Sequence, residues 1–503
     1  MAQEPSGTIS INDTGATATS ISFSAPALPS SVDGFVVLRT QFGGPIFPVD
    51  GQLYTTGMVN GTTTIAYSGN GTTFTDTGLL PGTQYNYMVV LYNGTGSYIN
   101  YSNSNTNLSS STLRAEPTTQ PNTLTFPTKD ENSISAQWNA GGGSEDGYLL
   151  IYKAGASPTN GAPVDGTSYN VGQSLGGGTV GLLNSFPNVN LNSLIPNTQY
   201  FFDIYSYSYT PEQNYYNYQQ LNPLEGSVFT LATQPSTPGG FSFNVTTNTS
   251  FNISFSGSAS NYLVLRRPSF SPDVDPVDAT TYVVGSALGS ATVVYNGSTT
   301  SFVDSGLTPG TLYVYKVFGY NGTATSSNYS FNAAQSSRFT APANPVANTG
   351  SSIAQTSFTA SWDTPVTATS YRLDVSIDPA FGSFVGVYNN LSVGTNSSSV
   401  TGLTQGITYY YRVRAVSSTG TSGNSNVATV LTAPPDPGGN RRNIAGTNVF
   451  HRKLECLIYR YIVLPRRIVE QYVLFICSSE CCCWKCFDLQ REYVADRRHS
   501  LLL

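Results

Sequence analysis

Cysteine and histidine, two residue types that commonly take part in catalysis and metal binding, are absent from the first 434 residues of this 503-residue chain. All six cysteines and both histidines lie beyond residue 434. Nucleophilic catalysis by serine or cysteine normally requires an imidazole or a comparable base, and structural zinc requires cysteine or histidine ligands. For residues 1–434 the sequence therefore predicts no hydrolase of these kinds, no zinc site and no disulfide.

Carboxylates remain, and the densest group of them is Asp273, Asp275 and Asp278. Calcium binds oxygen ligands of this kind, but the neighbouring prolines favour an ordinary turn. A pair of carboxylates could also serve a glycosidase, yet no segment of the sequence marks a cleft for a sugar chain. We therefore expect no enzyme activity, no catalytic residue, no metal and no cofactor.

Tyrosine is unusually dense between residues 200 and 218. Four of these side chains are candidates for ligand binding: Tyr205, Tyr209, Tyr215 and Tyr216. Exposed tyrosines stack on sugar rings and anchor protein partners. Packing within a loop, or against a neighbouring domain, is the favoured alternative.

The chain repeats a short motif four times, with leucine and tyrosine six residues apart. The motif spans residues 79–85, 194–200, 307–313 and 403–409. A large aromatic residue on an alternating strand lies 47 to 62 residues before each of these tyrosines, at Phe23, Trp138, Phe255 and Trp362. Tyr207 and Tyr218 also recur in the first and third copies, whereas the four candidate tyrosines exceed the repeat. Such recurrence predicts one structural unit per copy.

The apolar runs between the early aromatic residues and the leucine-tyrosine motifs are short and rich in Val, Tyr, Phe and Thr. Turn signals such as Asn-Gly separate them. Such runs are typical of antiparallel strands. No helical periodicity occurs before residue 435. The expected fold class is therefore all-β.

The motif Leu-x-Pro-Gly-Thr-x-Tyr, an earlier strand with a tryptophan, and units of about 100 residues resemble fibronectin type III domains. The similarity is strongest in the fourth unit, which carries Trp362 and the segment 402–415. The resemblance implies a tandem array of immunoglobulin-like antiparallel β-sandwiches. It also implies a tyrosine corner in each unit, whose hydroxyl bonds to upstream backbone: Tyr85, Tyr200, Tyr313 and Tyr409.

The first three units share an insertion that the fourth lacks, with Pro-Val-Asp followed by Tyr and Gly. It spans residues 48–57, 163–172 and 276–285. This pattern resembles a long-loop variant found in secreted and surface proteins of bacteria. The loop could bind a ligand, but a turn whose tyrosine folds back on the sandwich is favoured, because proline and aspartate suit turns.

Proline-rich junctions place the expected domains at residues 1–117, 118–235, 236–343 and 344–434. Residues 435–503 differ in composition, since they hold all the cysteines and carry a net charge of +4 against −10 for the rest. Their cysteines and histidines show no metal-ligand spacing, and no strand or helix period is sustained. We expect an unrelated, disordered or out-of-frame tail that contributes neither fold nor function. A metal knuckle and lipidated cysteines are the alternatives.

The acidic, charge-poor body disfavours nucleic acid as a partner, and no apolar run is long enough to span a membrane. These features predict a non-catalytic modular protein at the cell surface or outside the cell: a spacer, scaffold or adhesin with other proteins or cell-surface glycans as partners. No signal peptide is visible after Met1, so we expect the natural start upstream. The alternative is an accessory or carbohydrate-binding region of a larger secreted enzyme.

Overall fold

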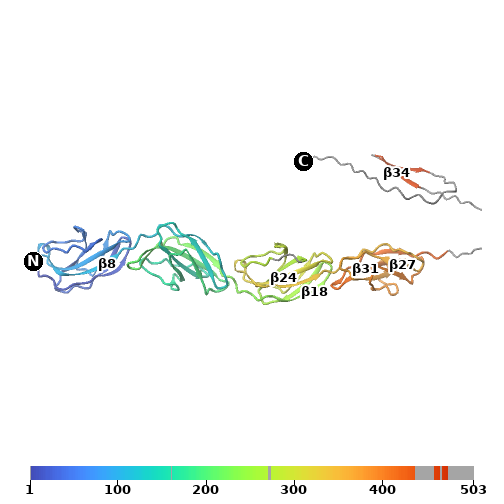
Figure 1. The fold of residues 1–503 in the computed structure, drawn as a ribbon, viewed down its shortest axis with the longest axis horizontal. Helices are drawn as coiled ribbons and strands as arrows, with labels where there is room; N and C mark the ends of the chain where they lie inside the picture. The colour runs from blue at the N-terminus through green and yellow to red at the C-terminus, as the bar shows by residue number, and fades with distance from the viewer. Residues whose placement is uncertain (1, 160, 270–273, 437–457, 465–466, 474–503) are drawn as a thin grey trace, which may run out of the picture. The chain divides into compact units, whose positions relative to one another are not determined.

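The computed structural model describes residues 2–159, 161–269, 274–436, 458–464 and 467–473. These residues form strands, loops and two short 3₁₀ turns (Figure 1). The strands before residue 434 fall into four sets that share no sheet, and we call these sets the first to fourth sandwich. The all-β fold class expected from the sequence is confirmed.

The first sandwich contains eight strands and one 3₁₀ turn: β1 (Asn12–Ala16), β2 (Ser20–Ser24), β3 (Gly34–Thr40), β4 (Val59–Asn60), β5 (Thr63–Gly69), β6 (Thr73–Thr77), β7 (Gln84–Asn93), η1 (Gly96–Tyr98) and β8 (Asn100–Ser111). One sheet has the order β1-β2-β6 and the other β4-β5-β3-β7-β8. All pairings are antiparallel.

The second sandwich contains β9 (Asn122–Thr125), β10 (Ile134–Asn139), β11 (Gly147–Ala154), β12 (Ser174–Leu175), β13 (Gly178–Asn184), β14 (Asn188–Leu191), β15 (Gln199–Thr210), β16 (Tyr215–Tyr218) and β17 (Leu224–Phe229). Its smaller sheet has the order β14-β10-β9. The larger sheet has the order β12-β13-β11-β15-β16, with β17 also paired to β15.

The third sandwich repeats this plan with β18 (Gly239–Thr246), β19 (Ser250–Ser256), β20 (Asn261–Pro268), β21 (Ala287–Leu288), β22 (Ala291–Gly297), β23 (Ser301–Ser305), β24 (Leu312–Asn321), η2 (Ala324–Ser326), β25 (Asn328–Tyr329) and β26 (Ala334–Phe339). The sheets have the orders β18-β19-β23 and β21-β22-β20-β24-β25, with β26 also paired to β24.

The fourth sandwich is smaller and contains β27 (Ser357–Ser361), β28 (Ser370–Ser376), β29 (Leu391–Val393), β30 (Ser397–Thr401), β31 (Thr408–Ser417), β32 (Gly420–Thr421) and β33 (Ala428–Leu431). Strands β27 and β30 form one sheet. The other has the order β29-β28-β31-β32, with β33 also paired to β31.

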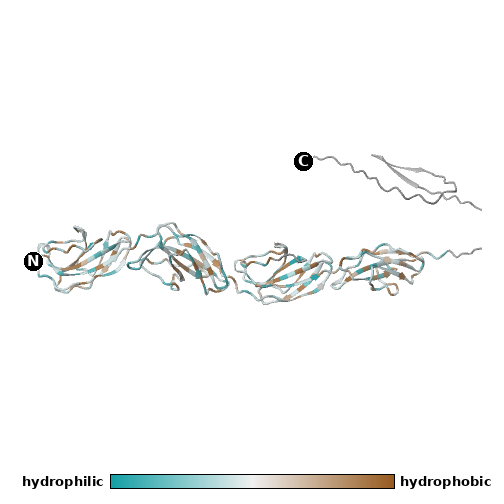
Figure 2. Ribbon diagram, viewed as in Figure 1, coloured by the Kyte–Doolittle hydropathy of each residue, from teal (hydrophilic) through white to brown (hydrophobic). Residues whose placement is uncertain are grey.

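Each sandwich buries its own apolar core between its two sheets. The early aromatic residue lies in that core in all four cases and is at most 6% exposed: Phe23, Trp138, Phe255 and Trp362. Figure 2 shows apolar residues concentrated along the strands. Because no core draws residues from another sandwich, each sandwich has the means to fold as a unit.

The repeated tyrosine closes a turn in every sandwich. Its hydroxyl accepts a hydrogen bond from the backbone N–H five residues earlier, at 2.8 to 3.0 Å. The four tyrosines are Tyr85, Tyr200, Tyr313 and Tyr409, and none is more than 8% exposed. The bond satisfies a hydroxyl that would otherwise be buried without a partner. This geometry is that of a tyrosine corner.

The insertion of the first three sandwiches covers the outer face of the larger sheet. In the first sandwich, Phe35 and Val37 of β3 face the main core, whereas Val36 and Leu38 pack in a second cluster with Tyr54 of the insertion. This division follows from the alternation of side chains along a strand. The second and third sandwiches contain corresponding clusters.

The inserted chain turns at a glycine with a left-handed backbone, namely Gly57, Gly172 or Gly285, whose φ values are 88°, 91° and 92°. Other residues rarely adopt this conformation. The N–H of each glycine donates to a carbonyl of the neighbouring strand at 2.8 Å. The loop is therefore fixed to the sheet through its backbone.

The chain divides into two compact units, residues 1–434 and 435–503. In the second unit, β34 (Ile458–Leu464) pairs antiparallel with β35 (Arg467–Val473). From the sequence we expected no strand period sustained long enough to bury a face, and the described residues of this unit form one short hairpin, whose β-branched and aromatic residues favour strand pairing. The cysteines and histidines lie outside the described residues, as does most of the segment expected to be disordered. No helix in the described part of the chain is long and apolar enough to cross a membrane.

Candidate functional site

The structure separates the four tyrosines that the sequence singles out for binding. Tyr205 is only 4% exposed and packs in the second apolar cluster beside Tyr207 and Tyr218. It occupies the position of Val90 and Phe318, which belong to the corresponding clusters of the first and third sandwiches. A buried ring offers no surface to a ligand, so the expectation was wrong for this residue.

Tyr209 and Tyr216 lie opposite each other on β15 and β16, and both are half-buried. Their ring centroids are 4.8 Å apart, with an angle of 41° between the ring planes. The Tyr209 hydroxyl donates a hydrogen bond to Asn214 Oδ1 at 3.1 Å. The two rings form a small, partly accessible aromatic surface of the kind that stacks on a sugar or packs against an apolar side chain.

Tyr215 lies at the junction with the first sandwich. Burial raises its pKa, and the charge of Asp13 and a hydrogen bond to that carboxylate raise it further. Asp13 belongs to β1 of the first sandwich. Tyr215 therefore makes the contact between domains that was the alternative to ligand binding.

The aspartate of each inserted loop holds the backbone of a nearby hairpin. Its Oδ1 accepts the N–H of a tyrosine at 2.7 to 2.8 Å, and that tyrosine's hydroxyl donates to a loop carbonyl at 2.9 to 3.0 Å. The three pairs are Asp50 with Tyr101, Asp165 with Tyr218, and Asp278 with Tyr329. We call this reciprocal pair of bonds the loop clamp. Since the repeated aspartate and a carbonyl of the same loop are both bonded within the sandwich, the repeated motif has a structural role.

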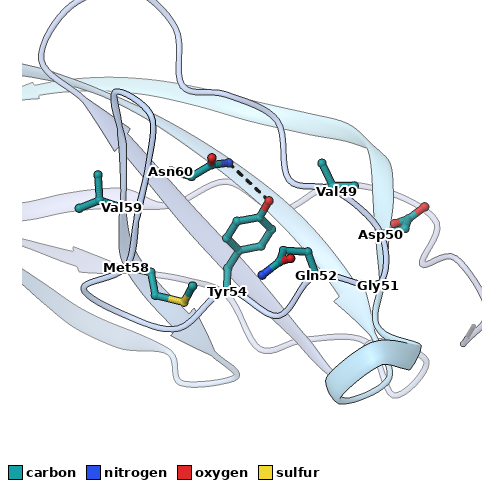
Figure 3. Close-up of a pocket in the computed structure, with 8 residues that line it drawn as sticks. All are labelled: Val49, Asp50, Gly51, Gln52, Tyr54, Met58, Val59 and Asn60. Atoms are coloured by element: carbon teal, nitrogen blue, oxygen red, sulfur yellow. Dashed lines mark hydrogen bonds between the residues drawn. The ribbon is translucent and has the colours of Figure 1, made fainter.

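A pocket of about 540 Å³ lies beneath the inserted loop of the first sandwich (Figure 3). Eight residues line it: Val49, Asp50, Gly51, Gln52, Tyr54, Met58, Val59 and Asn60. Val49 and Val59 are 61% and 68% exposed, whereas Tyr54 is 4% exposed. The hydroxyl of Tyr54 accepts a hydrogen bond from Asn60 Nδ2 at 3.4 Å.

The second and third sandwiches carry different residues and contacts at the same place. The hydroxyls of Tyr169 and Tyr282 accept the backbone N–H of the valine in Pro-Val-Asp at 2.9 Å. Leu175 and Leu288 stand where the first sandwich has Asn60, and both pack against the second apolar cluster. The polar side chain of Asn60 therefore distinguishes the first pocket.

A pocket lined by both apolar and polar side chains suits a small molecule that carries a hydrogen-bonding group. Sequence patterns do not predict this pocket, because Asn60 precedes Gly61 and an Asn-Gly pair indicates a turn. The signal that could have found it is the comparison of Asn60 with Leu175 and Leu288 across the aligned insertions.

The carboxylates considered for calcium have other partners. Asp275 accepts a bond from Lys316 Nζ at 2.9 Å, and Asp278 belongs to the loop clamp. Asp273 lies outside the described residues. Among the residues that the structure describes, no group of three His, Cys, Asp or Glu side chains could hold a metal ion.

Asp203 has a strongly perturbed pKa. It is 5% exposed and lies directly opposite Glu225 on the neighbouring strand. Burial, and secondly the charge of Glu225, raise the pKa of Asp203 to about 6. Because packing and repulsion within one sheet explain this value, we assign Asp203 no catalytic role.

Four antiparallel β-sandwiches, each closed by a tyrosine corner, define a modular array of the immunoglobulin-like class. Residues 341–431, which include all strands of the fourth sandwich, match the family described as fibronectin type III domain. The other three sandwiches repeat its corner tyrosine, and the second and third repeat its early aromatic residue. In the first sandwich Ala25 occupies the position of Trp362, because its N–H donates to the carbonyl of Thr72 as the N–H of Trp362 donates to that of Asn396, so the expected equivalence of Phe23 was wrong. The fourth sandwich thus matches this family, and the four sandwiches together have the architecture of tandem fibronectin type III domains.

Solved structures of such arrays resemble the chain at low identity. The FN1-FN3 domains of chicken CNTN1 are 14% identical, with 63% of this chain and 99% of that chain covered and a TM-score of 0.24. A two-domain fibronectin type III segment of chicken tenascin is 17% identical, with 44% and 99% covered and a TM-score of 0.22. No curated protein matches the chain. Function must therefore be inferred from the residues of this chain.

Proposed function

We propose that this protein is a non-catalytic spacer, scaffold or adhesin that acts at the cell surface or outside the cell through contacts with other proteins or glycans. The loop clamp gives the strongest support. It repeats in three sandwiches and uses the aspartate and tyrosine of the insertion to hold the fold. A repeated loop whose polar groups are bonded internally serves architecture more readily than recognition.

The surface chemistry of residues 1–434 also supports this role. Charged residues make up only 10% of the chain, and no histidine or cysteine occurs before residue 435. Serine, threonine and asparagine provide most of the polar surface, which suits an exported protein. A domain array with independent cores sets a distance that scales with the number of domains.

The test measures the reach of the chain, that is, how far from its anchored end it can present a reporter. The full chain is anchored to a bead through its first residue and carries a reporter peptide after Leu503, and single sandwiches are then deleted in turn. We expect capture of the reporter by a receptor on a second bead to fall by a similar amount for each deletion. A loss confined to deletion of one sandwich would contradict the spacer role and assign a binding site to that sandwich.

The accessible pair Tyr209 and Tyr216 favours one alternative, a carbohydrate-binding region attached to a larger secreted enzyme. If this pair binds sugar, the full chain binds members of a glycan array and the variant Tyr209→Ser with Tyr216→Ser does not. Tyr98→Ser is the matched control, because Tyr98 is 69% exposed on the first sandwich. Failure of the unaltered chain to bind any glycan removes this alternative.

A further inference from the structure

The three sandwiches with an insertion share a contact that involves neither the main core nor the tyrosine corner. An asparagine precedes the tyrosine of each loop clamp: Asn100, Asn217 and Asn328. Its Nδ2 donates to a carbonyl of the segment that enters the sandwich, that of Ala2, Arg114 and Ala232, at 3.0, 2.8 and 2.7 Å. Asn217 and Asn328 are 6% and 2% exposed, so water competes little for these bonds.

Further bonds hold the same segment by its backbone. The N–H groups of Ala2 and Ala232 donate to the carbonyls of Tyr98 and Ser326, each at 2.8 Å. In the second sandwich, the N–H of Arg114 donates to Thr210 Oγ1 at 3.0 Å. Because these contacts recognise backbone groups, they fit an extended segment of almost any sequence.

In the first and third sandwiches the entering segment also approaches the turn of the hairpin so closely that only glycine fits there. A Cβ atom at Gly94 or Gly322 would lie 2.7 or 2.8 Å from the Cβ atom of Ala2 or Ala232. Asn93 and Asn321 precede these glycines and donate to the next carbonyl of the entering segment at 3.0 and 2.7 Å. The first and third sandwiches thus carry the same complete surface.

The loop clamp braces this surface. Asp165 binds the N–H of Tyr218, the residue that follows Asn217, and Asp278 does the same for Tyr329 after Asn328. The insertion therefore fixes the strand that presents the asparagine. The chain of contacts leads from the insertion through the clamp and the asparagine to the entering segment.

We propose that the hairpin carrying the asparagine, formed by β7 and β8, by β15 and β16 or by β24 and β25, is a docking surface. Its occupant is the exit segment of the preceding sandwich, and the insertion holds this surface in shape. The inference rests on the proposed spacer function and deepens it, because it assigns the parts that fix one sandwich on the next. We call each such contact a joint. The partner is an extended segment that leaves the last strand of a preceding fibronectin type III sandwich.

Direct contacts between sandwiches accompany both joints. Arg114 forms an ion pair with Asp146 beside the joint into the second sandwich. At the joint into the third sandwich, Ser326 Oγ donates to Asn197 Oδ1 at 2.7 Å. The fourth sandwich has no insertion, and Thr419 Oγ1 reaches the exit segment through a 3.4 Å bond to the Thr340 carbonyl. The asparagine contact therefore belongs to the joints into the second and third sandwiches, whereas the junction before the fourth relies on other contacts.

Distances between spin labels test the proposal in the full chain. The six cysteines of the tail are changed to serine, and labels are attached in pairs at equivalent exposed strand positions: Thr73→Cys, Asn188→Cys and Ser301→Cys. Labelling is specific because residues 1–434 contain no cysteine. Pulsed electron paramagnetic resonance then gives the width of the distance distribution for each pair.

Each joint is broken by one substitution. Asn217→Ala broadens the distribution between positions 73 and 188 and leaves the other pair unchanged, whereas Asn328→Ala affects only positions 188 and 301. Asn100→Ala is the matched control and broadens neither, because Asn100 holds the segment at Ala2. Hydrogen exchange at the amide of Ala232 quickens about fivefold in Asn328→Ala, the factor that corresponds to one lost hydrogen bond.

Thermal melting of each variant checks that the sandwiches remain folded. If Asn217→Ala and Asn328→Ala melt normally and the distributions keep their widths, the proposal is wrong. Equal broadening in Asn100→Ala would also overturn it. Either of these results would contradict the joints but not the spacer function. The spacer function is tested separately, by whether the reach of the chain falls with each deleted sandwich.

Discussion

The first and second sandwiches have different types of side chain at the same three positions beneath the corner tyrosine: an ionic triad in the first and an apolar set in the second. In the first, Asp76 is 4% exposed, pairs with Arg39 Nη1 at 2.7 Å and accepts the Tyr87 hydroxyl at 2.9 Å. The third sandwich repeats this triad with Arg266, Asp304 and Tyr315. The second sandwich has an apolar set instead: Tyr152, Leu191 and Phe202.

The register of the strands establishes that these positions correspond. Arg39 pairs with Tyr87 across β3 and β7, and Tyr152 pairs with Phe202 across β11 and β15. The same fold therefore tolerates a buried ionic triad or its apolar replacement. The desolvation of a buried ion pair roughly cancels its attraction, so neither solution has a large advantage in stability.

The largest effect is expected when the triad is broken rather than replaced. Asp76→Ala leaves the Arg39 guanidinium and the Tyr87 hydroxyl without their shared carboxylate. We expect a loss of about 3 to 5 kcal/mol in the first sandwich, measured by chemical denaturation. Asp304→Ala should cost the third sandwich a similar amount. A loss below about 1 kcal/mol in both would show that the triad behaves like an exposed ion pair.

The second sandwich should respond to pH through Asp203. Its folded-state pKa of about 6 exceeds the ordinary value of about 4, so the folded state binds the proton more tightly. The stabilising contribution is present below pH 4 and is lost as pH rises through 6, with a total of at most about 3 kcal/mol. Asp203→Asn should flatten this dependence and raise stability at pH 7.

The first sandwich is the internal control for this effect, because Met88 occupies the position of Asp203. Melting temperatures of the two sandwiches between pH 4 and 7 provide the measurement. If Asp203→Asn melts with the same pH dependence as the unaltered chain, Asp203 does not titrate in this range.

A smaller effect is expected in the pocket of the first sandwich. Asn60→Leu copies Leu175 and Leu288, buries additional apolar surface under the loop, and should stabilise the first sandwich by about 1 kcal/mol. The reverse change, Leu288→Asn, should destabilise the third sandwich. Denaturation curves of the two variants measure both effects. Destabilisation by Asn60→Leu would indicate that the pocket is shaped by other residues.

The elements that sequence predicts well depend on local spacing. The corner hydroxyl binds an N–H five residues away, so the seven-residue motif already contains both partners. The early aromatic residues mark alternating strands for the same local reason. The tandem fibronectin type III fold was therefore within reach of the sequence alone.

The elements that sequence misses depend on residues far apart in the chain. Arg39 and Asp76 are 37 residues apart, and Asn217 is 103 residues from Arg114. No periodicity links such pairs, so only the folded register reveals them. Tyr205 was misassigned because the second cluster beneath the insertion was not foreseen, although aligning it with Val90 and Phe318 would have suggested an apolar position.

Calorimetry of the full chain tests most directly whether the sandwiches are separate structural modules, as a spacer requires. Asp76→Ala should lower one transition and leave the others in place. The combined exchange of Arg39→Tyr, Asp76→Leu and Tyr87→Phe should return that transition to within about 1 kcal/mol of its original stability. A common shift of all transitions in Asp76→Ala would contradict modular folding and show that residues 1–434 unfold as one cooperative block.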